Sequence, residues 1–320
     1  MKKKIVILTG DPNSINLEII HKFWKKINKS LKQRIYFISN EKLIKHQFHK
    51  LKLSLKTTVV KDIFATADSN KLKIIDLKLD FKDPFNVPFN AASKFVKASL
   101  NLGHKIAQRR EVAGLINCAI DKKLLGTDKI GVTEYLARKC KVKKDKEVMI
   151  IGNKKLSVCP ITTHIDVREI SKRINSKIII NKLITIESWY KYKYKRKPKI
   201  GILGLNPHNA ELRKYSEEKK FIIPAIKKLK KKGIKVDGPL VSDTVFISAY
   251  KNYDIIVGMY HDQVLSPFKT LFKFNAINIT LGLKYLRVSP DHGTARDLIG
   301  KNKANAKSIL ECLNFLNKFS

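Results

Sequence analysis

Short apolar runs alternate with stretches of helical periodicity along all 320 residues of the chain, and this alternation constrains the fold most. Short apolar runs bounded by turn residues predict buried strands, whereas apolar residues three and four positions apart predict helices. Strands that are joined through helices lie parallel, with helices on both faces of the sheet. The predicted strands are residues 5–8, 35–38, 115–119, 148–151, 200–205, 255–259 and 276–280, and the predicted helices are residues 14–29, 91–110, 133–138, 165–175, 217–232 and 305–319. The chain is therefore predicted to adopt an α/β fold with largely parallel sheets.

The chain carries a formal net charge of +39, and only ten of its 66 basic residues are arginine. Sequence-specific nucleic-acid binders rely on arginine, whereas lysine is spread over this whole chain and attracts anions in general. Residues 191–199 interleave tyrosine with lysine, which fits either a nucleic-acid surface or the solvated end of a helix and its linker, and the second interpretation is favoured. We expect a small phosphorylated substrate and no specific nucleic acid, with a lysine-rich nucleic-acid binder as the less favoured alternative.

The sequence shows no signal for export or membrane insertion. The first apolar run, residues 5–8, ends at Thr9 and is too short for a signal peptide. No apolar stretch approaches the length of about 18 residues that a membrane span needs. The four cysteines are scattered without a CxxC pair, which is typical of reduced thiols. We therefore expect a cytoplasmic protein with no membrane partner.

Polar residues gather directly after several predicted strands. The junctions are residues 10–12, 204–208, 260–263 and 289–294. In parallel sheets, ligands bind beyond the carboxyl ends of the strands, so these junctions predict a site. Carboxylates at such ends serve either in acid–base chemistry or as caps of turns and helices, and both interpretations stay open for Asp11 and Asp291.

The eight histidines divide into two groups by their surroundings. His164, His208, His261 and His292 fall at strand or loop ends, and converging imidazoles of this kind suit a divalent metal with an open position. No HxH or HExxH pattern supports that interpretation from spacing alone. The other four lie in lysine-rich surroundings and are predicted to be on the surface: His21, His46, His49 and His104.

No phosphate-binding glycine motif is present. Residues 201–204 follow a predicted strand but do not form GxGxxG, and residues 10–15 lack the third glycine. A dinucleotide would therefore have to be held in another way.

Several motifs in order and in register resemble the 4-hydroxythreonine-4-phosphate dehydrogenase family of vitamin B6 biosynthesis. They are Gly204-Leu-Asn-Pro-His208, the segment 238–246, Met259-Tyr-His-Asp-Gln263, the segment 278–283 and Asp291-His-Gly-Thr-Ala295. The opening Thr9-Gly-Asp-Pro12, Asn90-Ala-Ala92 and Thr162-Thr-His164 also match. The resemblance extends from residue 4 to about residue 318 and is strongest after residue 200.

The resemblance implies a two-domain α/β/α fold like that of isocitrate and isopropylmalate dehydrogenases. Residues 1–125 and 265–320 would form the cofactor-side domain, and residues 126–264 the domain for metal, substrate and dimerisation. It also implies a homodimer with the active site shared across the interface, and NAD (or NADP) held without a Rossmann motif.

Metal and catalytic roles follow from the same resemblance. It assigns His164, His208 and His261 to one divalent ion per subunit (Zn, Mg or Co), shared between dimeric partners. Such an ion lowers the pKa of the substrate hydroxyl and stabilises charge on its oxygen. The catalytic residues would be Asp243, Asp262 and Lys269, in which the two aspartates orient ligands or relay a proton.

Substrate and cofactor contacts complete the implied site. Lysine and arginine neutralise a carboxylate or phosphate, and the substrate contacts would be Thr133, Lys269, Asn278 and Arg287. The cofactor contacts would be Gly10, Asp11, His292, Gly293, Thr294 and Asn305, with His292 and Asn305 on the adenine side.

The implied reaction is NAD-dependent oxidation of 4-phosphonooxy-L-threonine at its hydroxyl carbon, followed by decarboxylation to 3-amino-1-hydroxyacetone phosphate. Two departures bear on the substrate. Val132 replaces a histidine that the family usually has, and the glycine-rich start of the family becomes Gly10-Asp-Pro-Asn-Ser-Ile-Asn16. The alternative is a related dehydrogenase for another phosphorylated hydroxy acid, such as 4-phosphothreonate.

Overall fold

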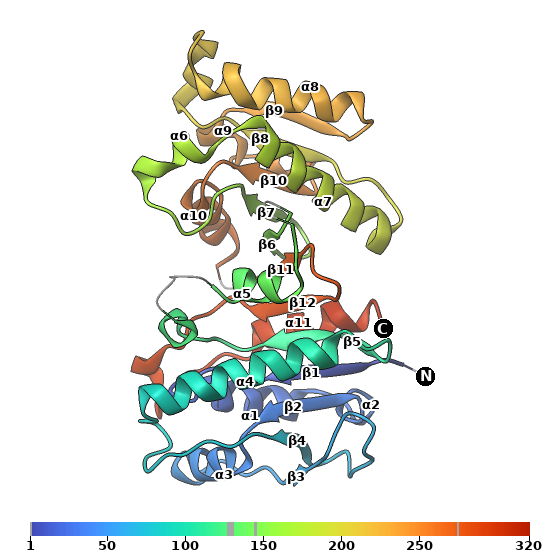
Figure 1. The fold of residues 1–320 in the computed structure, drawn as a ribbon, viewed down its shortest axis with the longest axis vertical. Coiled ribbons are helices and arrows are strands. Elements are labelled where there is room, and N and C mark those ends of the chain that lie inside the picture. Colours follow the sequence, from blue (N-terminus) through green and yellow to red (C-terminus); the bar gives the residue numbers. More distant parts are fainter. Residues whose placement is uncertain (1, 127–130, 144–145, 274) are drawn as a thin grey trace. The chain divides into compact units, whose positions relative to one another are not determined.

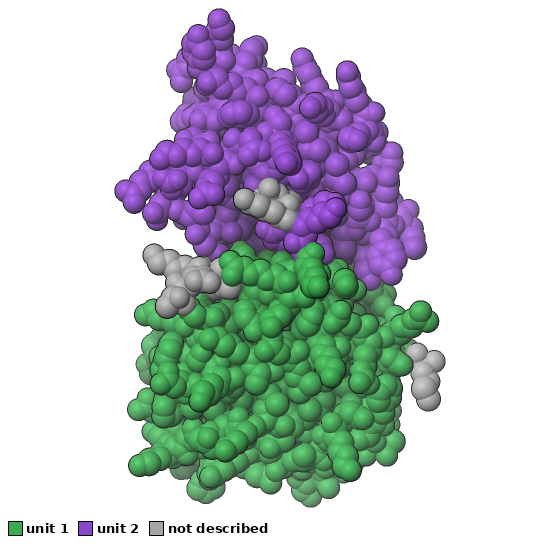
Figure 2. Space-filling model, viewed as in Figure 1, with its two compact units in different colours: residues 1–141, 283–320 green, residues 142–282 purple. Residues whose placement is uncertain are grey.

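The computed structural model describes residues 2–126, 131–143, 146–273 and 275–320. The chain forms two compact units, which are coloured separately in Figure 2. Unit 1 comprises residues 1–141 and 283–320, and unit 2 comprises residues 142–282. The predicted division had the same discontinuous form, but residues 131–141, with Thr133, lie in unit 1, and residues 265–282, with Lys269 and Asn278, lie in unit 2.

The described residues of unit 1 form six parallel strands in the order β3-β4-β2-β1-β5-β12. They are β1 (Lys4–Leu8), β2 (Ile35–Ser39), β3 (Thr57–Val59), β4 (Leu72–Asp76), β5 (Val112–Asn117) and β12 (Arg287–Pro290). The helices of this unit are α1 (Asn16–Lys26), α2 (Lys29–Lys32), α3 (Glu41–Lys50), α4 (Phe89–Ala107), α5 (Val132–Lys139) and α11 (Lys307–Asn317), with short 3₁₀ turns at Lys122–Leu125 and Arg296–Leu298.

Helices cover both faces of the unit 1 sheet, as strand β5 shows. Consecutive residues of a strand point to opposite faces. Leu115 lies against Gly103 of α4, whereas a Cβ placed on Gly114 would lie 2.6 Å from Leu316 of α11. The α/β/α layering predicted from the alternation of strands and helices is therefore confirmed in this unit (Figure 1).

In unit 2, the part of the chain that the structure describes forms six strands in the order β11-β6-β7-β10-β8-β9. They are β6 (Val148–Gly152), β7 (Ser157–Pro160), β8 (Ile200–Leu203), β9 (Val236–Leu240), β10 (Ile255–Gly258) and β11 (Ile277–Leu281). The four strands β7, β10, β8 and β9 are parallel neighbours, while β6 is antiparallel to both β7 and β11. The carboxyl ends of four neighbouring strands therefore meet at one edge of this sheet.

The helices of unit 2 pack on these strands. They are α6 (Ile170–Arg173), α7 (Ser176–Tyr194), α8 (Ile223–Lys231), α9 (Ser242–Val245) and α10 (His261–Phe272), with single turns at Val167–Glu169, Pro207–Leu212, Glu218–Ile222 and Ala249–Asn252. Phe268 of α10 is fully buried in a core with Val158 and Ile256 of the strands. None of the helices in the described part of the chain combines the length and apolar content needed to cross a membrane.

All seven predicted strands are present, with ends that differ by a few residues. The five additional strands each lack a continuous apolar run. β4 contains Lys73, whose Nζ donates to the Gln33 carbonyl at 2.6 Å and lies 4.1 Å from the centre of the Tyr36 ring. β9 contains Gly238-Pro239, and β12 starts at Arg287. Because these strands contain polar or turn residues, they cannot be predicted from continuous apolar runs.

The predicted helix at 165–175 is wrong in extent, because only Val167–Glu169 and Ile170–Arg173 are helical. The long helix there is α7, which starts after Asn175, whose side chain accepts the Ile178 N–H at 3.0 Å. Isoleucines stand at consecutive positions of α7, so its apolar residues give no one-sided pattern. The favoured interpretation of residues 191–199 is confirmed, since α7 ends there and a linker leads to β8.

The prediction that His21 lies on the surface is wrong. His21 is buried, with 5% of its surface exposed. It shares the inner face of α1 with Leu17 and Trp24, four residues before and three residues after it, and packs edge-on against Phe48 of α3. Burial lowers the pKa of this imidazole, which favours its neutral form.

Candidate functional site

The three histidines assigned to a metal follow three neighbouring parallel strands of unit 2. His164 follows β7, His261 follows β10 and His208 follows β8. The rings of His164 and His261 lie 5.7 Å apart, centre to centre. Asp243 follows the next strand, β9, and is exposed. Sheet topology therefore brings these side chains to one edge, as expected for ligand sites in parallel sheets.

His261 and Asp262 lie in the first turn of α10 rather than in a loop, and their side chains are paired. The Nδ1 atom of His261 lies 2.6 Å from Oδ1 of Asp262. A carboxylate only accepts hydrogen bonds, so Nδ1 carries a proton in this pair, and in the neutral imidazole Nε2 is the nitrogen with the lone pair. Histidine ligands of metals are commonly oriented by a carboxylate in this way, so the His261–Asp262 pair has the chemistry of a metal ligand.

A buried carboxylate organises the loop that carries His208. Glu218 is fully buried, and its Oε1 accepts the N–H groups of Leu205 and Asn206, each at 2.8 Å. The Nδ2 group of Asn206 adds a hydrogen bond to Oε2 of Glu218 at 3.0 Å. Burial opposes the charge of Glu218, but these hydrogen bonds outweigh it and hold the pKa of the carboxyl below its usual value.

His208 opens a left-handed turn. Residues 208–212 all have φ values between 49° and 57°, a region that is unfavourable for residues with a side chain. Asn209 supports the turn, since its backbone N–H donates to the Asn206 carbonyl at 3.1 Å and its Nδ2 donates to the Pro239 carbonyl at 3.0 Å. Ala210 is buried beneath it. The strained backbone is thus held by contacts around it, as is common at functional sites.

Replacing Glu218 by glutamine is expected to lower the free energy of unfolding by about 1.5–3 kcal/mol at pH 7, because a charged acceptor is lost and an amide N–H₂ faces the Asn206 donor. Since the pKa of Glu218 is depressed in the folded state, its contribution is fully present above pH 4.5, the ordinary value, and is lost as the pH falls further. Urea unfolding between pH 7 and pH 3.5 tests this. Glu211→Gln, at an exposed carboxylate of the same loop, is the control. If the difference in the free energy of unfolding between the wild type and Glu218→Gln is unchanged at pH 3.5, the stabilising role of the Glu218 carboxylate is contradicted.

Lys269 and Asn278 are the remaining predicted residues of unit 2. Lys269 lies in the last turn of α10 and is half-buried. Asn278 lies on β11, and its Oδ1 is buried with no hydrogen-bond partner in the described residues. Within the described part of one chain, no group of three His, Cys, Asp or Glu side chains is placed to hold a metal ion.

In unit 1, two predicted substrate contacts lie side by side. The buried guanidinium of Arg287 donates through Nε to Oδ1 of Asn117 at 2.5 Å and through NH1 to Oγ1 of Thr133 at 3.2 Å. Burial lowers the pKa of Arg287 to about 10, so the group remains charged at neutral pH. Asn117, which the sequence did not single out, orients this fork from the end of β5.

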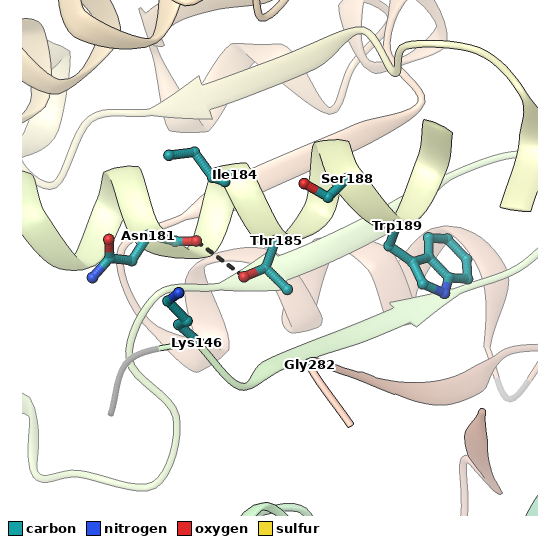
Figure 3. Close-up of a pocket in the computed structure, with 7 residues that line it drawn as sticks. All are labelled: Lys146, Asn181, Ile184, Thr185, Ser188, Trp189 and Gly282. Carbon is teal, nitrogen blue, oxygen red and sulfur yellow. Dashed lines mark hydrogen bonds between the residues drawn. The ribbon is translucent and has the colours of Figure 1, made fainter. Parts of the chain in front are cut away.

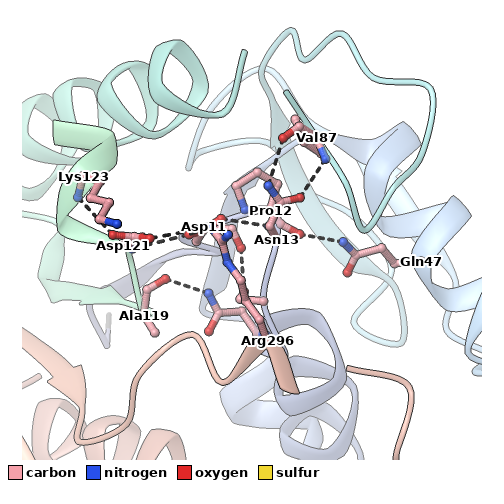
Figure 4. A network of polar contacts seen from close by, with 11 residues as sticks. Asp11, Pro12, Asn13, Gln47, Val87, Ala119, Asp121, Lys123 and Arg296 are labelled. Atoms are coloured by element: carbon pink, nitrogen blue, oxygen red, sulfur yellow. Dashed lines mark hydrogen bonds and ion pairs between the residues drawn. The ribbon is translucent and has the colours of Figure 1, made fainter. Parts of the chain in front are cut away.

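The loop after β1 contains Asp11, whose side chain is buried and serves the loop itself (Figure 4). Its Oδ1 accepts the Asn13 N–H at 2.8 Å, and its Oδ2 lies 3.6 Å from the guanidinium of Arg296. Burial raises the pKa of Asp11, while these neighbours oppose the shift. The alternative of a turn-forming role for Asp11 is therefore borne out, and its contact with a cofactor stays a prediction.

Polar side chains at the positions where this loop departs from the family's glycine-rich pattern fill the loop. Asn13 exchanges two hydrogen bonds with the backbone of Val87, at 2.9 and 2.8 Å. Asn16 Nδ2 donates to the Ala119 carbonyl at 2.8 Å, and a Cβ on Gly10 would lie 2.4 Å from that same oxygen. Gly10, at φ +77°, is therefore required by the packing of the loop, and its backbone is covered by protein.

The segment after β12 contains the other predicted cofactor residues. Nδ1 of His292 lies 2.9 Å from the Gly293 carbonyl and must donate to it, which leaves Nε2 as an acceptor. That Nε2 is buried with no partner in the described residues, and burial lowers the pKa of His292. An unpaired buried acceptor fits a hydroxyl or amino group of a bound nucleotide. Thr294 accepts the Ile15 N–H through its carbonyl, at 3.2 Å.

Two residues of α1 hold the chain next to Asn305. Lys22 donates to the carbonyls of Asn302 and Ala304 at 2.8 and 2.9 Å, and Glu18 accepts the Ala304 N–H at 3.0 Å. Asn305 itself is exposed, and its Oδ1 accepts the Lys307 N–H at 2.8 Å in a turn just before α11. Neither Glu18 nor Lys22 stands out in the sequence, because a pair of opposite charges four residues apart is common on helix surfaces.

A separate pocket of about 430 Å³ lies along α7 in unit 2 (Figure 3). Its lining comprises Lys146, Asn181, Ile184, Thr185, Ser188, Trp189 and Gly282. None of these is a predicted site residue, so this pocket does not bring the candidate site together.

Comparison with known proteins places these features in a family. The profile of the family described as "Pyridoxal phosphate biosynthetic protein PdxA" matches residues 30–316. The chain is 38% identical to the 4-hydroxythreonine-4-phosphate dehydrogenase of Sulfurihydrogenibium sp. over 97% of its length and 96% of the relative's. It is 37% identical to the enzyme of that name from Aquifex aeolicus, over 99% and 98%. A protein of Oceanobacillus iheyensis, provisionally named a D-threonate 4-phosphate dehydrogenase, is 31% identical over 98% and 97%.

Solved structures agree with this placement. The crystal structure of 4-hydroxythreonine-4-phosphate dehydrogenase from Klebsiella pneumoniae superposes with a TM-score of 0.83 at 27% identity, covering 98% of both chains. Isocitrate dehydrogenase from Methylococcus capsulatus shares the fold, with a TM-score of 0.52 at 11% identity over 99% of this chain and 85% of that chain. The predicted fold class is thereby confirmed. On the strength of the profile match and of relatives similar along nearly their whole length, the chain belongs to the PdxA family of pyridoxal phosphate biosynthetic proteins.

Proposed function

We propose that this chain is a 4-hydroxythreonine-4-phosphate dehydrogenase of vitamin B6 biosynthesis. It would oxidise 4-phosphonooxy-L-threonine at its hydroxyl carbon and release carbon dioxide to give 3-amino-1-hydroxyacetone phosphate. The observation that carries the proposal is the placement of three histidines beyond β7, β8 and β10, in a chain whose relatives bear that name.

His164, His208 and His261 are the residues that would hold a divalent ion, zinc, magnesium or cobalt. Such an ion, when bound, lowers the pKa of the substrate hydroxyl and stabilises negative charge on oxygen. Asp262 keeps the proton of His261 on Nδ1, so that Nε2 is the ligand atom. Asp243, which is exposed and follows β9 at the same edge, would hold or relay a proton.

The phosphorylated substrate would be bound by cationic and amide side chains. The Arg287 fork, oriented by Asn117 and shared with Thr133, suits a carboxylate or phosphate. Lys269 supplies a second cation, and the unpaired buried Oδ1 of Asn278 supplies an acceptor for the amino group of the substrate.

NAD (or NADP) would accept the hydride from the substrate carbon. The buried Nε2 of His292 is the acceptor that supports a nucleotide contact there, and the chain from 302 to 305 is held for it by Lys22 and Glu18. The four cysteines are buried free thiols, which accords with a cytoplasmic enzyme.

A homodimer is part of this proposal. Three exposed apolar side chains lie in segments that follow strands of unit 2: Val167 is 80%, Tyr215 74% and Ile247 75% exposed. They lie beyond β7, β8 and β9, respectively. Apolar side chains gathered at one edge are typical of a surface that a partner covers, and a second copy covering it would adjoin the histidines.

A related substrate, 4-phosphothreonate, is the second candidate. The relative from Oceanobacillus iheyensis carries a name of that kind, and Val132, at the start of α5, has no hydrogen-bonding group for an amino acid substrate or a phosphate. The two substrates differ at the α-carbon, where one bears an amino group and the other a hydroxyl.

The test is NADH formation by the purified protein with each substrate, NAD and a divalent metal, before and after dialysis against a chelator. We expect turnover with 4-phosphonooxy-L-threonine, a loss of at least about 100-fold after chelation, and recovery when the metal is returned. Preference for 4-phosphothreonate would select the second candidate. Activity with neither substrate at saturating NAD and metal would overturn the proposed function.

A further inference from the structure

Gln263 lies in the first turn of α10, among the loops that follow three strands of unit 2. Its Oε1 accepts the Met259 N–H at 2.6 Å, and its Nε2 donates to the Gly204 carbonyl at 2.7 Å and to Ser242 Oγ at 2.8 Å. An N–H can only donate and a carbonyl can only accept, so these partners define the orientation of the amide. Both amide hydrogens and the amide oxygen of Gln263 are thereby engaged.

Each of these three partners belongs to a different strand end. Gly204 follows β8 and begins the segment that leads to His208, Ser242 precedes Asp243 after β9, and Met259 follows β10 just before His261. One side chain therefore joins three loops, each of which carries a residue assigned to the site.

The fourth loop is joined through Met259. The Met259 carbonyl accepts both the backbone N–H of Thr162, at 3.1 Å, and its Oγ1 hydroxyl, at 2.7 Å. Thr162 lies two residues before His164, in the loop after β7. The backbone of Met259 is thus held on one side by Gln263 and on the other by the His164 loop.

Gly258, the last residue of β10, leaves room for the Gln263 amide beside the strand. A Cβ on Gly258 would lie 2.8 Å from Oε1 of Gln263 and 2.6 Å from Cγ1 of Val264. Any side chain at position 258 would push α10 or the Gln263 amide away from the sheet. The requirement for glycine here follows from the positions of both the Val264 side chain and the Gln263 amide beside the strand.

We propose that Gln263 is a positioning residue, which sets the relative placement of the loops of His164, His208 and His261 and so determines the affinity for a divalent metal. This inference rests on the proposed function, since it concerns the metal site. Removing the groups that orient metal ligands typically lowers metal affinity 10- to 100-fold, and we expect a loss in that range.

The experiment compares Co²⁺ binding, followed by its visible absorption, in the wild type and in two variants of the full chain. Gln263→Met keeps the volume and loses all three hydrogen bonds. Gln263→Glu keeps an oxygen that accepts the Met259 N–H, but its second oxygen faces the Gly204 carbonyl, where a donor is needed. This variant therefore tests the same contacts if the methionine variant folds poorly. Both are expected to bind Co²⁺ 10- to 100-fold more weakly.

Asn153 provides the matched control. It makes three side-chain hydrogen bonds, with Lys155 N–H, Leu156 N–H and the Asn275 carbonyl, in the turn between β6 and β7 at the other end of these strands. Asn153→Leu is expected to lower the melting temperature without changing Co²⁺ affinity. Hydrogen exchange adds a second readout, since the amides of 204–209 and 242–246 should exchange faster in the Gln263 variants alone.

The outcomes separate this inference from the proposed function. If the wild type binds Co²⁺ and the Gln263 variants bind it equally well with a lowered melting temperature, Gln263 only stabilises the fold and the inference fails. If the wild type itself binds no divalent metal, the metal site fails, and the inference with it. An equal loss of Co²⁺ affinity in Asn153→Leu would also overturn the inference, because general destabilisation would then explain the effect.

Discussion

Replacing His208 by asparagine is expected to reduce metal-dependent NADH formation by about 10³-fold, corresponding to roughly 4 kcal/mol of lost stabilisation. His208 has a φ of 49°, and asparagine adopts this left-handed conformation more readily than alanine, so the backbone of the turn should persist. The substitution therefore removes the imidazole while preserving its loop. Steady-state rates with saturating metal and the Co²⁺ affinity measure the effect.

His49, an exposed histidine of α3 in unit 1, provides the control for this substitution. His49→Asn removes an imidazole of the same kind from a surface to which no role is assigned, and it should leave the rate within a factor of two. If the His208→Asn variant has the same rate and the same Co²⁺ affinity as the wild type, His208 is not a metal ligand. A rate loss accompanied by partial unfolding in circular dichroism would instead indicate damage to the turn.

Replacing Arg287 by methionine is expected to lower kcat/KM by about 10²–10³-fold, because the variant loses the buried, hydrogen-bonded charge that we propose binds the substrate. Asn117 Oδ1 and Thr133 Oγ1 would lose their donor, at a further cost of about 1–3 kcal/mol in the free energy of unfolding. Arg287→Lys keeps the charge without the planar fork and should give an intermediate loss. Kinetics at saturating NAD, together with urea unfolding, measure both effects.

A substitution of Arg34 serves as the control that distinguishes a loss of substrate binding from a loss of stability. It is also buried in unit 1, where it donates through Nε to the Lys3 carbonyl at 2.8 Å and through NH1 to Asn317 Oδ1 at 2.7 Å. Arg34→Met should destabilise the protein by a similar amount without a comparable change in KM. Equal kinetic losses in the two variants would show that Arg287 acts only through the stability of unit 1.

The general architecture of the protein was predictable because it rests on local signals. Buried strands such as residues 5–8 and 255–258 are continuous apolar runs, and helices such as α4 show a one-sided apolar pattern. The rule that ligands bind beyond the carboxyl ends of parallel strands then pointed to the junctions that contain His208 and His261. These signals require no knowledge of distant contacts.

Elements whose burial depends on distant partners were missed. β4 contains Lys73, which is buried because Gln33 and Tyr36 accommodate its ammonium group. His21 reads as a surface residue among lysines, yet the packing of α1 on α3 buries it. A sequence window cannot reveal such partners, since they lie far away along the chain.

The sequence by itself determined the α/β class and the family, because periodicity and motifs consist of residues close together in the chain. It also predicted the three histidines as metal ligands. Only the tertiary structure decided how the site is supported. Asp11 is buried and accepts a hydrogen bond within its own loop, and Glu218 accepts backbone N–H groups of the segment that leads to His208. Gln263 is hydrogen-bonded to residues that follow three different strands. The physical reason is that a hydrogen bond depends on the position and direction of both partners, and those are defined only when separate strands meet at one edge of a sheet.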